Sequence, residues 1–379
     1  MTFYLVVFAL LWLGVFFSTA RGEILIDFEL LALIAFILIA GQRFETGNDW
    51  LIYRDHYIAL QNFGLDAGEN PQFPVFEPLY ALLVWMIGYL FDFQIFLLLV
   101  ALFNGIVLYR FARAWRASFL GLFAIYYAWI YLATQMATIR YSLAISFVLL
   151  ALISLMRHKK WLAFTLLLIS AGFHLFSLVF IVLFAVLGRN LNFRWAFAAL
   201  LGGFVAIYAT LHGVEAGYLA WLPFSEKITF YMEGATSDHL SAGSAAYIAL
   251  NFIFFLWLMR SQEADIRTRI AKWSVFLLLF SQVALWMLPI FWNRVQIFTL
   301  IIQACVLSVY FVERRRLISS FFVCLLSLGM LVKFLADPAY VSYIPYQSYW
   351  VELFLPGTAR GGEGRFYDAI DANRDRGAR

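Results

Sequence analysis

Two residues that could do chemistry, Arg140 and His174, stand inside otherwise apolar runs. Arg140 opens one run and His174 lies within the next, on either side of a basic turn at 157–160. At a helical rise of ~1.5 Å per residue, each lies roughly 20 to 25 Å from that turn, so the two side chains should reach a similar depth in a membrane. Because charged and polar groups are costly within a bilayer, this pair indicates a functional site.

Other polar residues reach the same side of the membrane if the basic turns are cytoplasmic. They stand just outside apolar runs or at the ends of such runs. The candidate site residues are therefore Asp49, Tyr53, Glu77, Arg140, His174, Arg294, Lys333 and Tyr346. We expect Arg140, Arg294, Lys333, His174 and Asp49 to share one outward-facing cavity.

These residue types suit group transfer from a phosphorylated donor. Guanidinium groups bind phosphate oxygens in a fixed fork, so Arg140 and Arg294 could hold a pyrophosphate as it becomes a leaving group. A carboxylate or imidazole near an acceptor could remove its hydroxyl proton, and Asp49 or His174 could take that role. No aspartate cluster or Cys/His spacing indicates a held metal, so we predict no metal and no cofactor, with arginine stabilising the charge.

Each candidate also has an ordinary structural interpretation. Arg140 could extend from a helix end to the lipid headgroups. His174 could be a hydrogen-bonded packing residue, and Asp49 a solvated carboxylate in a loop. Glu77 precedes Pro78 and suits the positive end of a helix. Lys333, Tyr346 and other residues near the headgroups could be anchors, and the remaining histidines are expected at the surface or in turns: His56, His158, His212 and His239.

Composition places the chain in a membrane. Its 379 residues are 64% hydrophobic and 13% charged, whereas a soluble domain holds roughly a quarter charged residues. Many apolar runs reach the ~20 residues that cross ~30 Å of hydrocarbon. The sequence predicts an all-α, polytopic transmembrane protein with 11 or 12 hydrophobic segments. These are 3–20, 24–41, 77–91, 93–112, 118–134, 138–156, 161–187, 195–212, 244–260, 271–289, 295–312 and 317–335.

The charge distribution predicts the orientation of these segments. The net charge of +4 gathers in short turns, as the positive-inside rule requires of cytoplasmic turns, so we do not expect nucleic-acid binding. The connectors 42–76 and 213–243 are acidic on balance and would lie outside the cytoplasm. We expect one transmembrane domain, 1–337, followed by a polar and partly disordered tail, 338–379. Cys305 and Cys324 lie within apolar segments and suit packing.

Counting crossings against this orientation gives two conflicts. Both disappear if 77–91 is re-entrant or interfacial and if 161–187 is a pair of half-helices broken near Gly172, since broken backbone is tolerated where it lines a cavity. The alternative is that 42–76 is cytoplasmic, or that the basic residues at 189 and 194 depart from the rule.

Short motifs along nearly the whole chain resemble one known family. They are Gly47-Asn48-Asp49-Trp50 with Tyr53, Phe76-Glu77-Pro78-Leu79-Tyr80, Ile139-Arg140-Tyr141-Ser142-Leu143-Ala144, Phe173-His174, Asn293-Arg294 and Ile344-Pro345-Tyr346. Together they resemble the EpsG family of exopolysaccharide polymerases, which are similar to O-antigen polymerases of the Wzy type. Members of the family more often have Gly-Thr-Asp where this chain has Gly47-Asn48-Asp49. The chain differs from them at the middle residue and keeps the aspartate.

This resemblance implies a membrane glycosyltransferase of the C-type group in the bacterial plasma (inner) membrane. It would join undecaprenyl-pyrophosphate-linked oligosaccharide repeat units outside the cytoplasm, displacing the lipid pyrophosphate, in exopolysaccharide, capsule or O-antigen synthesis. A chain-length regulator and a flippase are the protein partners that the resemblance suggests, and the lipid bilayer is the surrounding medium.

Three alternatives stay open at this point. A transferase that uses a polyprenyl-monophosphate donor would add single sugars. A transporter or flippase of lipid-linked oligosaccharide favours paired charges near mid-membrane and inverted repeats, and no repeat is visible in the chain. A structural scaffold is disfavoured because a buried arginine needs an anionic or polar partner.

Overall fold

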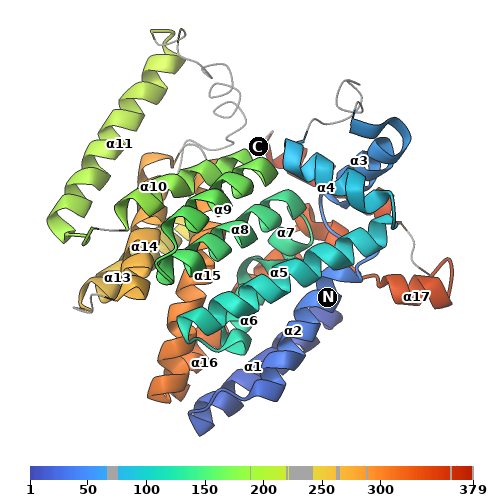
Figure 1. Ribbon diagram of the computed structural model, residues 1–379, viewed down its shortest axis with the longest axis horizontal. Coiled ribbons are helices and arrows are strands. Elements are labelled where there is room, and N and C mark those ends of the chain that lie inside the picture. The colour runs from blue at the N-terminus through green and yellow to red at the C-terminus, as the bar shows by residue number, and fades with distance from the viewer. Residues whose placement is uncertain are drawn as a thin grey trace. The chain divides into compact units, whose positions relative to one another are not determined.

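The computed structural model describes residues 1–65, 76–187, 189–218, 221, 242–261, 265–286, 289–358 and 361–377. Every named element in these ranges is a helix (Figure 1), and the chain is a polytopic helical membrane protein. Within the described residues, six helical stretches are long and apolar enough to cross a membrane: Thr2–Arg21, Phe93–Trp115, Ile139–Met156, Phe193–Glu215, Phe291–Phe311 and Leu317–Ala336.

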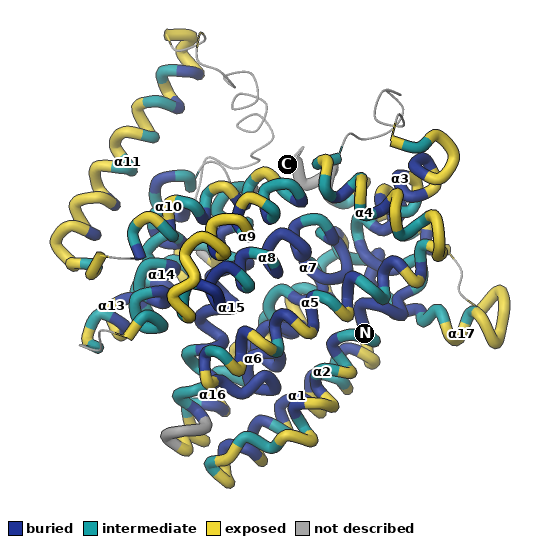
Figure 2. The backbone as a smooth tube through the Cα atoms, in the orientation of Figure 1, coloured by how far each residue is buried: buried dark blue, intermediate teal, exposed yellow. Residues whose placement is uncertain are grey.

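Large apolar side chains cover the outer surfaces of several of these helices. On α1 (Thr2–Arg21), Leu10 and Leu13 are each 64% exposed, and exposed faces alternate with buried ones along the helix (Figure 2). On α16 (Leu317–Ala336), Ile318 and Phe322 are exposed in the same way. Apolar surface of this extent is unfavourable in water and suits contact with lipid.

The chain divides into two compact units, of which the first comprises 1–180 and 304–372. In this unit α8 packs against α9 and α5, while α2 packs against α5 and α6. Its helices, besides α1 and α16, are α2 (Ile26–Gly41), α3 (Trp50–Phe63), α4 (Pro78–Gly88), α5 (Phe93–Trp115), α6 (Phe119–Tyr126), the π-helical turn η2 (Tyr127–Tyr131), α7 (Leu132–Gln135), α8 (Ile139–Met156), α9 (Lys160–Phe173), η3 (Leu175–Leu178), η4 (Pro338–Tyr343), α17 (Tyr349–Phe354) and most of α18 (Gly362–Gly377).

A buried carboxylate joins α2 to the start of α6. Glu29 is 1% exposed, and its carboxylate accepts hydrogen bonds from Ser118 Oγ (2.5 Å) and from the backbone N–H groups of Phe119 (2.7 Å) and Leu120 (3.2 Å). These N–H groups begin a helix and have no partner within it, so they and the positive helix end stabilise the charge.

A polar network between membrane helices positions α8, which carries Arg140. Asn104 on α5 donates to Gln135 Oε1 and to Ser142 Oγ, each at 2.9 Å, and accepts from Ser146 Oγ at 2.6 Å. In lipid no hydrophobic force drives helices together, so hydrogen bonds between side chains of different helices contribute to their association. The network therefore holds the first turns of α8 against α5 and α7.

The segment predicted as 161–187 is broken, as expected. It begins as α9, takes an extended conformation at His174 (φ −159°, ψ 113°), and continues as η3 and α10 (Val179–Val186). The break falls at His174 rather than at Gly172. Gly172 instead permits close packing, because a Cβ there would lie 2.4 Å from Leu79 Cδ1 on α4.

The predicted segment 77–91 is the short helix α4. Its 11 residues measure ~16 Å along the axis, about half the thickness of the hydrocarbon layer. This length suits the re-entrant or interfacial placement that we predicted, and the membrane face of each connector stays a prediction.

The C-terminal segment pairs with the connector that leads into α3. Phe44 N–H donates to Gln347 O (2.9 Å), and Gly47 N–H donates to Ser342 O (3.2 Å). These bonds join segments about 300 residues apart in the sequence, and they hold the start of α3 against η4.

The tail predicted from 338 onward contains η4, α17 and α18 in its described part. Phe366 of α18 is buried with Trp50 and Leu51 of α3. This apolar contact, together with polar contacts described below, anchors α18 although its sequence is rich in charge and glycine.

The second unit comprises 181–303 and 373–379. In this unit α14 packs against α11 and α13, and Gln303 Nε2 donates to Asn251 Oδ1 at 2.8 Å. The described helices here are most of α10, α11 (Phe193–Glu215), α13 (Ala242–Met259), α14 (Ile266–Ala284) and the first half of α15 (Pro289–Arg314). Most of the predicted loop 213–243 lies outside the described residues.

Candidate functional site

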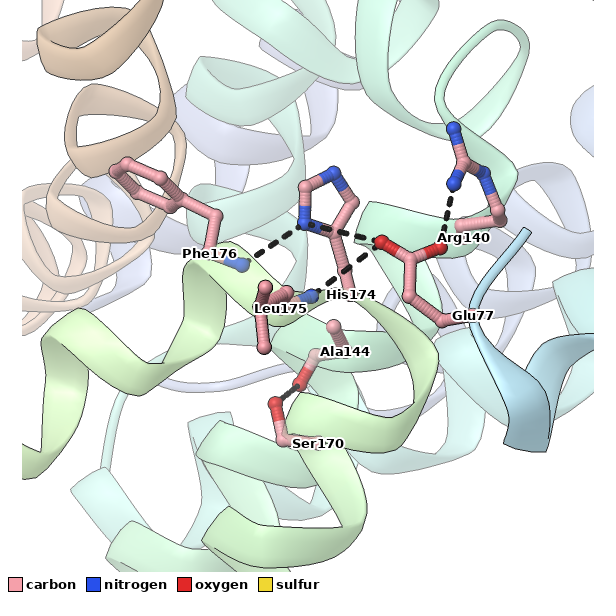
Figure 3. A network of polar contacts seen from close by, with 7 residues as sticks. All are labelled: Glu77, Arg140, Ala144, Ser170, His174, Leu175 and Phe176. Atoms are coloured by element: carbon pink, nitrogen blue, oxygen red, sulfur yellow. Dashed lines mark hydrogen bonds and ion pairs between the residues drawn. The ribbon is translucent and has the colours of Figure 1, made fainter. Parts of the chain in front are cut away.

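Glu77 brings Arg140 and His174 together. Arg140, in the first turn of α8, donates from Nη1 to Glu77 Oε2 in an ion pair, and Glu77 stands just before α4 (Figure 3). Glu77 Oε1 accepts from Leu175 N–H at 3.3 Å and lies 3.9 Å from His174 Nδ1. The three side chains keep 15 to 23% of their surface exposed. The arginine and histidine predicted at matched depth thus meet around one carboxylate.

Backbone geometry selects the tautomer of His174. Its Nδ1 accepts the N–H of Phe176 at 3.2 Å, which requires a lone pair on Nδ1 and puts the proton of the neutral ring on Nε2. In Figure 3, Nε2 and the terminal nitrogen of Arg140 that does not contact Glu77 point to the same side, away from the carboxylate. In this tautomer the Nε2–H of His174 is available to donate a hydrogen bond on that side.

Aromatic residues surround the Arg140 guanidinium. Its Cζ lies 4.0 Å from the centre of the Phe76 ring, a distance suited to a cation–π contact. The Tyr53 side chain is hydrogen-bonded to Arg140, and the rings of Tyr53 and Phe76 are 5.7 Å apart. A carboxylate, a phenol and an aromatic face together fix the orientation of the guanidinium.

Asp49 adjoins this cluster through Tyr53. It is the residue before α3, half-buried, and stands four residues before Tyr53, so the two share one face of the helix. Burial raises the pKa of Tyr53, and the Asp49 charge raises it further, whereas the Arg140 charge lowers it. Asp49 and Arg140 therefore both lie close enough to act on the same phenol.

The remaining candidates have other surroundings. Tyr346 donates its hydroxyl to Ile39 O (3.1 Å) in the last turn of α2 and stacks on Phe3 with ring centres 4.2 Å apart. Lys333 is exposed in the last turn of α16. Arg294 is half-buried on α15 in the second unit.

Arg43 is a buried arginine beside the site, and it was not among the candidates predicted from the sequence. It is 2% exposed, and its Nη1 donates to Gln135 O (2.6 Å) and Ala40 O (3.2 Å), in the last turns of α7 and α2. The negative ends of two helices thus hold the cation, although burial lowers its pKa. Its charge also acts on Tyr53 and Tyr80.

His56 is buried, contrary to the surface position that we expected. It is 3% exposed, 4.3 Å from the ring of Phe76 and stacked on Tyr80 at 6.0 Å. The available signal was its helical spacing, three residues after Tyr53, on the buried face of α3. Burial, and then the charge of Arg140, lower the pKa of His56 to about 4, so the ring is neutral at pH 7.

The buried imidazole should make the protein acid-sensitive. His56 becomes protonated below about pH 6.5 in the unfolded chain, but only below about pH 4 in the folded chain. The free energy of unfolding is therefore highest above pH 6.5 and falls as the pH drops from 6.5 to about 4. The loss reaches about 3 kcal/mol at most. H56F, which keeps the aromatic stack, should flatten the fall in Tm between pH 7 and 5 in detergent, measured by differential scanning fluorimetry. The exposed-site control H212Q should retain the wild-type slope, and an equal slope in H56F would contradict this origin.

The fold and the site together define the class of this protein: it is a multi-pass helical membrane protein with a partly exposed arginine–carboxylate–histidine cluster. The EpsG family model matches residues 28–348, most of the chain, and the protein therefore belongs to the EpsG family. This match confirms the resemblance seen in the motifs, and an exopolysaccharide-polymerase type of function follows from it in general terms. No curated protein and no solved structure matches the chain.

Proposed function

We propose that this protein polymerises undecaprenyl-pyrophosphate-linked oligosaccharide repeat units at the outer face of a bacterial plasma membrane. The observation that carries the proposal is the paired presentation of Arg140 and His174 Nε2 to one side of Glu77 (Figure 3). Two donors so arranged suit the oxygens of a departing phosphate. Membership of the EpsG family supports the reaction class.

In this mechanism the acceptor hydroxyl oxygen attacks the anomeric carbon of the donor sugar. A new C–O bond forms, the bond from that carbon to the pyrophosphate oxygen breaks, and the pyrophosphate leaves with the electron pair. Arg140 binds the developing charge and His174 donates a hydrogen bond to it. Asp49 takes the proton from the acceptor, because the lone pair on His174 Nδ1 already accepts the Phe176 N–H.

The other candidates have supporting roles in the proposal. Glu77 and Tyr53 position Arg140 through their contacts with it. Arg294 is proposed as a second phosphate contact and Lys333 as a contact of the anionic lipid headgroup. Tyr346 would act through the C-terminal turn of α2, where its hydroxyl is bonded.

The proposal predicts both products of a purified reaction. Protein in lipid nanodiscs, given undecaprenyl-pyrophosphate-linked repeat units from the producing cells, should yield a ladder of polymer lengths on a gel. Mass spectrometry should find one undecaprenyl pyrophosphate released for each linkage formed. Single-sugar addition from a polyprenyl-monophosphate donor would show the alternative transferase. Movement of the lipid-linked oligosaccharide across vesicles without new linkages would show a flippase, and either result would overturn the proposal.

A further inference from the structure

The C-terminal segment carries a short helix whose side chains are apolar and exposed. This helix, α17, buries none of its six residues and extends outward from the first unit (Figure 1). Five large apolar side chains in it and directly after it are 50 to 79% exposed: Trp350, Val351, Leu353, Phe354 and Leu355. We call these five side chains the α17 surface. A contiguous apolar surface of this kind is unfavourable in water and marks an interaction site.

The α17 surface begins at the level where three apolar helices of the first unit end. Tyr349 N–H donates to Gln42 O at 2.7 Å, directly after α2. Gln94, at the start of α5, donates from Nε2 to the carbonyl of the last residue of α2 at 2.8 Å. Tyr4, at the start of α1, donates its hydroxyl to Tyr343 O at 2.8 Å. Because α1 and α5 are long enough to span a bilayer, this level marks one boundary of the hydrocarbon layer.

The lipid-facing surface of α1 continues toward α17. A stripe of side chains three or four residues apart on α1 is 39 to 64% exposed: Phe3, Val6, Leu10 and Leu13. At the end of the stripe, Phe3 stacks on Tyr346 with ring centres 4.2 Å apart. Tyr346 stands three residues before α17, so the apolar surface of α1 leads to the segment from which α17 extends.

Contacts on both sides of α17 hold it at this level. Before it, the segment that ends at Ser348 is bonded to the connector before α3, as described above. After it, α18 is held on the same connector and on α3, since Glu363 pairs with Arg54 at 2.9 Å and Arg365 Nη2 donates to Glu45 O at 3.0 Å. The exposure of α17 therefore belongs to a helix between two anchored segments.

The residue types of α17 favour a lipid surface as its partner. Trp and Tyr are enriched where a membrane meets water, and Tyr349 and Trp350 open the helix. Glu352, the one charged residue of α17, accepts a hydrogen bond from Gly357 N–H at 2.6 Å in the turn that follows. A stable protein interface takes about 20 to 30 residues on each side, far more than α17 offers.

We infer that α17 is an interfacial membrane anchor. It lies on the side of the membrane that carries the connector before α3, and its apolar side chains insert ~5 to 10 Å into the boundary between headgroups and acyl chains. The inference goes beyond the proposed polymerase function and does not depend on it.

Fluorescence quenching in nanodiscs that hold one chain each tests the inference. An environment-sensitive dye is attached to the single cysteine of F354C, L10C or D368C, in the background C305A/C324A. L10C reports on the lipid-facing middle of α1, and D368C on an exposed position of α18. The lipids carry a spin-label quencher either near the headgroup or near the end of the acyl chain, and iodide is the quencher in water.

The dye at position 354 should be quenched most by the label near the headgroup. At position 10 the label near the acyl-chain end should quench most, and at position 368 iodide should. Iodide quenching at 354 without lipid quenching would overturn the inference, because α17 would then lie in water. Shielding of 354 from lipid and iodide alike would place protein over α17, and stronger quenching by the deep label would place it in the hydrocarbon layer; either result would also overturn the inference.

A charge on the α17 surface should release the helix from the membrane. W350E lies one turn before position 354 on the same side of α17, and it should shift the balance between inserted and water-exposed α17 by roughly tenfold or more toward water. Y367E is the matched control, since Tyr367 is an aromatic residue of α18 that is 57% exposed. It should leave quenching at 354 unchanged, and an equal loss in both variants would contradict the anchor.

The unaltered chain provides a second measurement that needs no cysteine replacement. Nanodisc lipids with a photoreactive group near the headgroup should crosslink to the peptide that contains α17 and not to the peptide that contains α18, as located by mass spectrometry. Absence of crosslinks to α17 would overturn the inference.

Discussion

R140A should lower polymer synthesis by roughly 10²- to 10³-fold while the protein stays folded in the membrane. The guanidinium is the cation at the centre of the site, held by Glu77, Phe76 and Tyr53. Its removal takes away the group proposed to stabilise the leaving pyrophosphate. Polymer is measured by gel in cells and in nanodiscs, alongside protein amount and Tm.

Two further variants separate charge from geometry at this position. R140K keeps the charge but not the planar fork, so it should restore a small part of the activity. E77Q keeps the size of the side chain but removes the charge that orients the guanidinium, so its loss should be smaller than that of R140A.

The matched control for R140A is R21A. Arg21 also lies over an aromatic ring, 4.5 Å from the centre of Phe17, but at the exposed end of α1. It should retain normal polymer. Normal polymer length and amount in R140A, at normal protein level, would remove Arg140 from the mechanism.

G47A should give the largest loss of stability among single substitutions in the connector before α3. Gly47 has φ +112°, which residues with a Cβ rarely adopt, and a Cβ there would lie 2.2 Å from the backbone carbonyl of Met136. Backbone on both sides must move to relieve this contact, at a cost of about 3 kcal/mol or more. We expect a lower Tm in detergent and loss of polymer, because the connector sets the positions of Asp49 and Tyr53.

Gly64 provides the control for G47A. It too has a positive φ, +64°, but a Cβ there would meet no atom of the described residues within 4 Å. G64A should therefore cost only the backbone strain of its conformation, φ +64° with ψ −157°, about 1 to 3 kcal/mol, with polymer retained. Equal Tm values for G47A and G64A would show that the approach to Met136 is not what requires glycine at position 47.

The sequence by itself determined the class of the protein and the places of its long apolar helices, whereas α3, α17 and α18 fall in stretches predicted as a connector and a tail. An apolar run long enough to span a bilayer is expected to form a helix there, because lipid offers the backbone no hydrogen-bond partners. The sequence also predicted the break in 161–187. We placed it near Gly172, and the helix breaks at His174, two residues further on. Arg140 and His174 could be paired in advance because helical rise converts sequence distance into depth.

Only the tertiary structure decided which groups touch that pair. Glu77 is 63 residues from Arg140 and 98 from Leu175, and no local pattern relates positions so far apart. The buried states of Glu29, Arg43 and His56 likewise depend on packing. The Glu29 carboxylate meets the start of α6, the Arg43 guanidinium meets the ends of α7 and α2, and the His56 imidazole meets aromatic rings. In the sequence each of the three is an ordinary polar residue. The local sequence pattern determines where helices form and how deep a residue lies in the membrane. The interaction partners of a side chain instead follow from how the helices pack, and that packing depends on the whole chain.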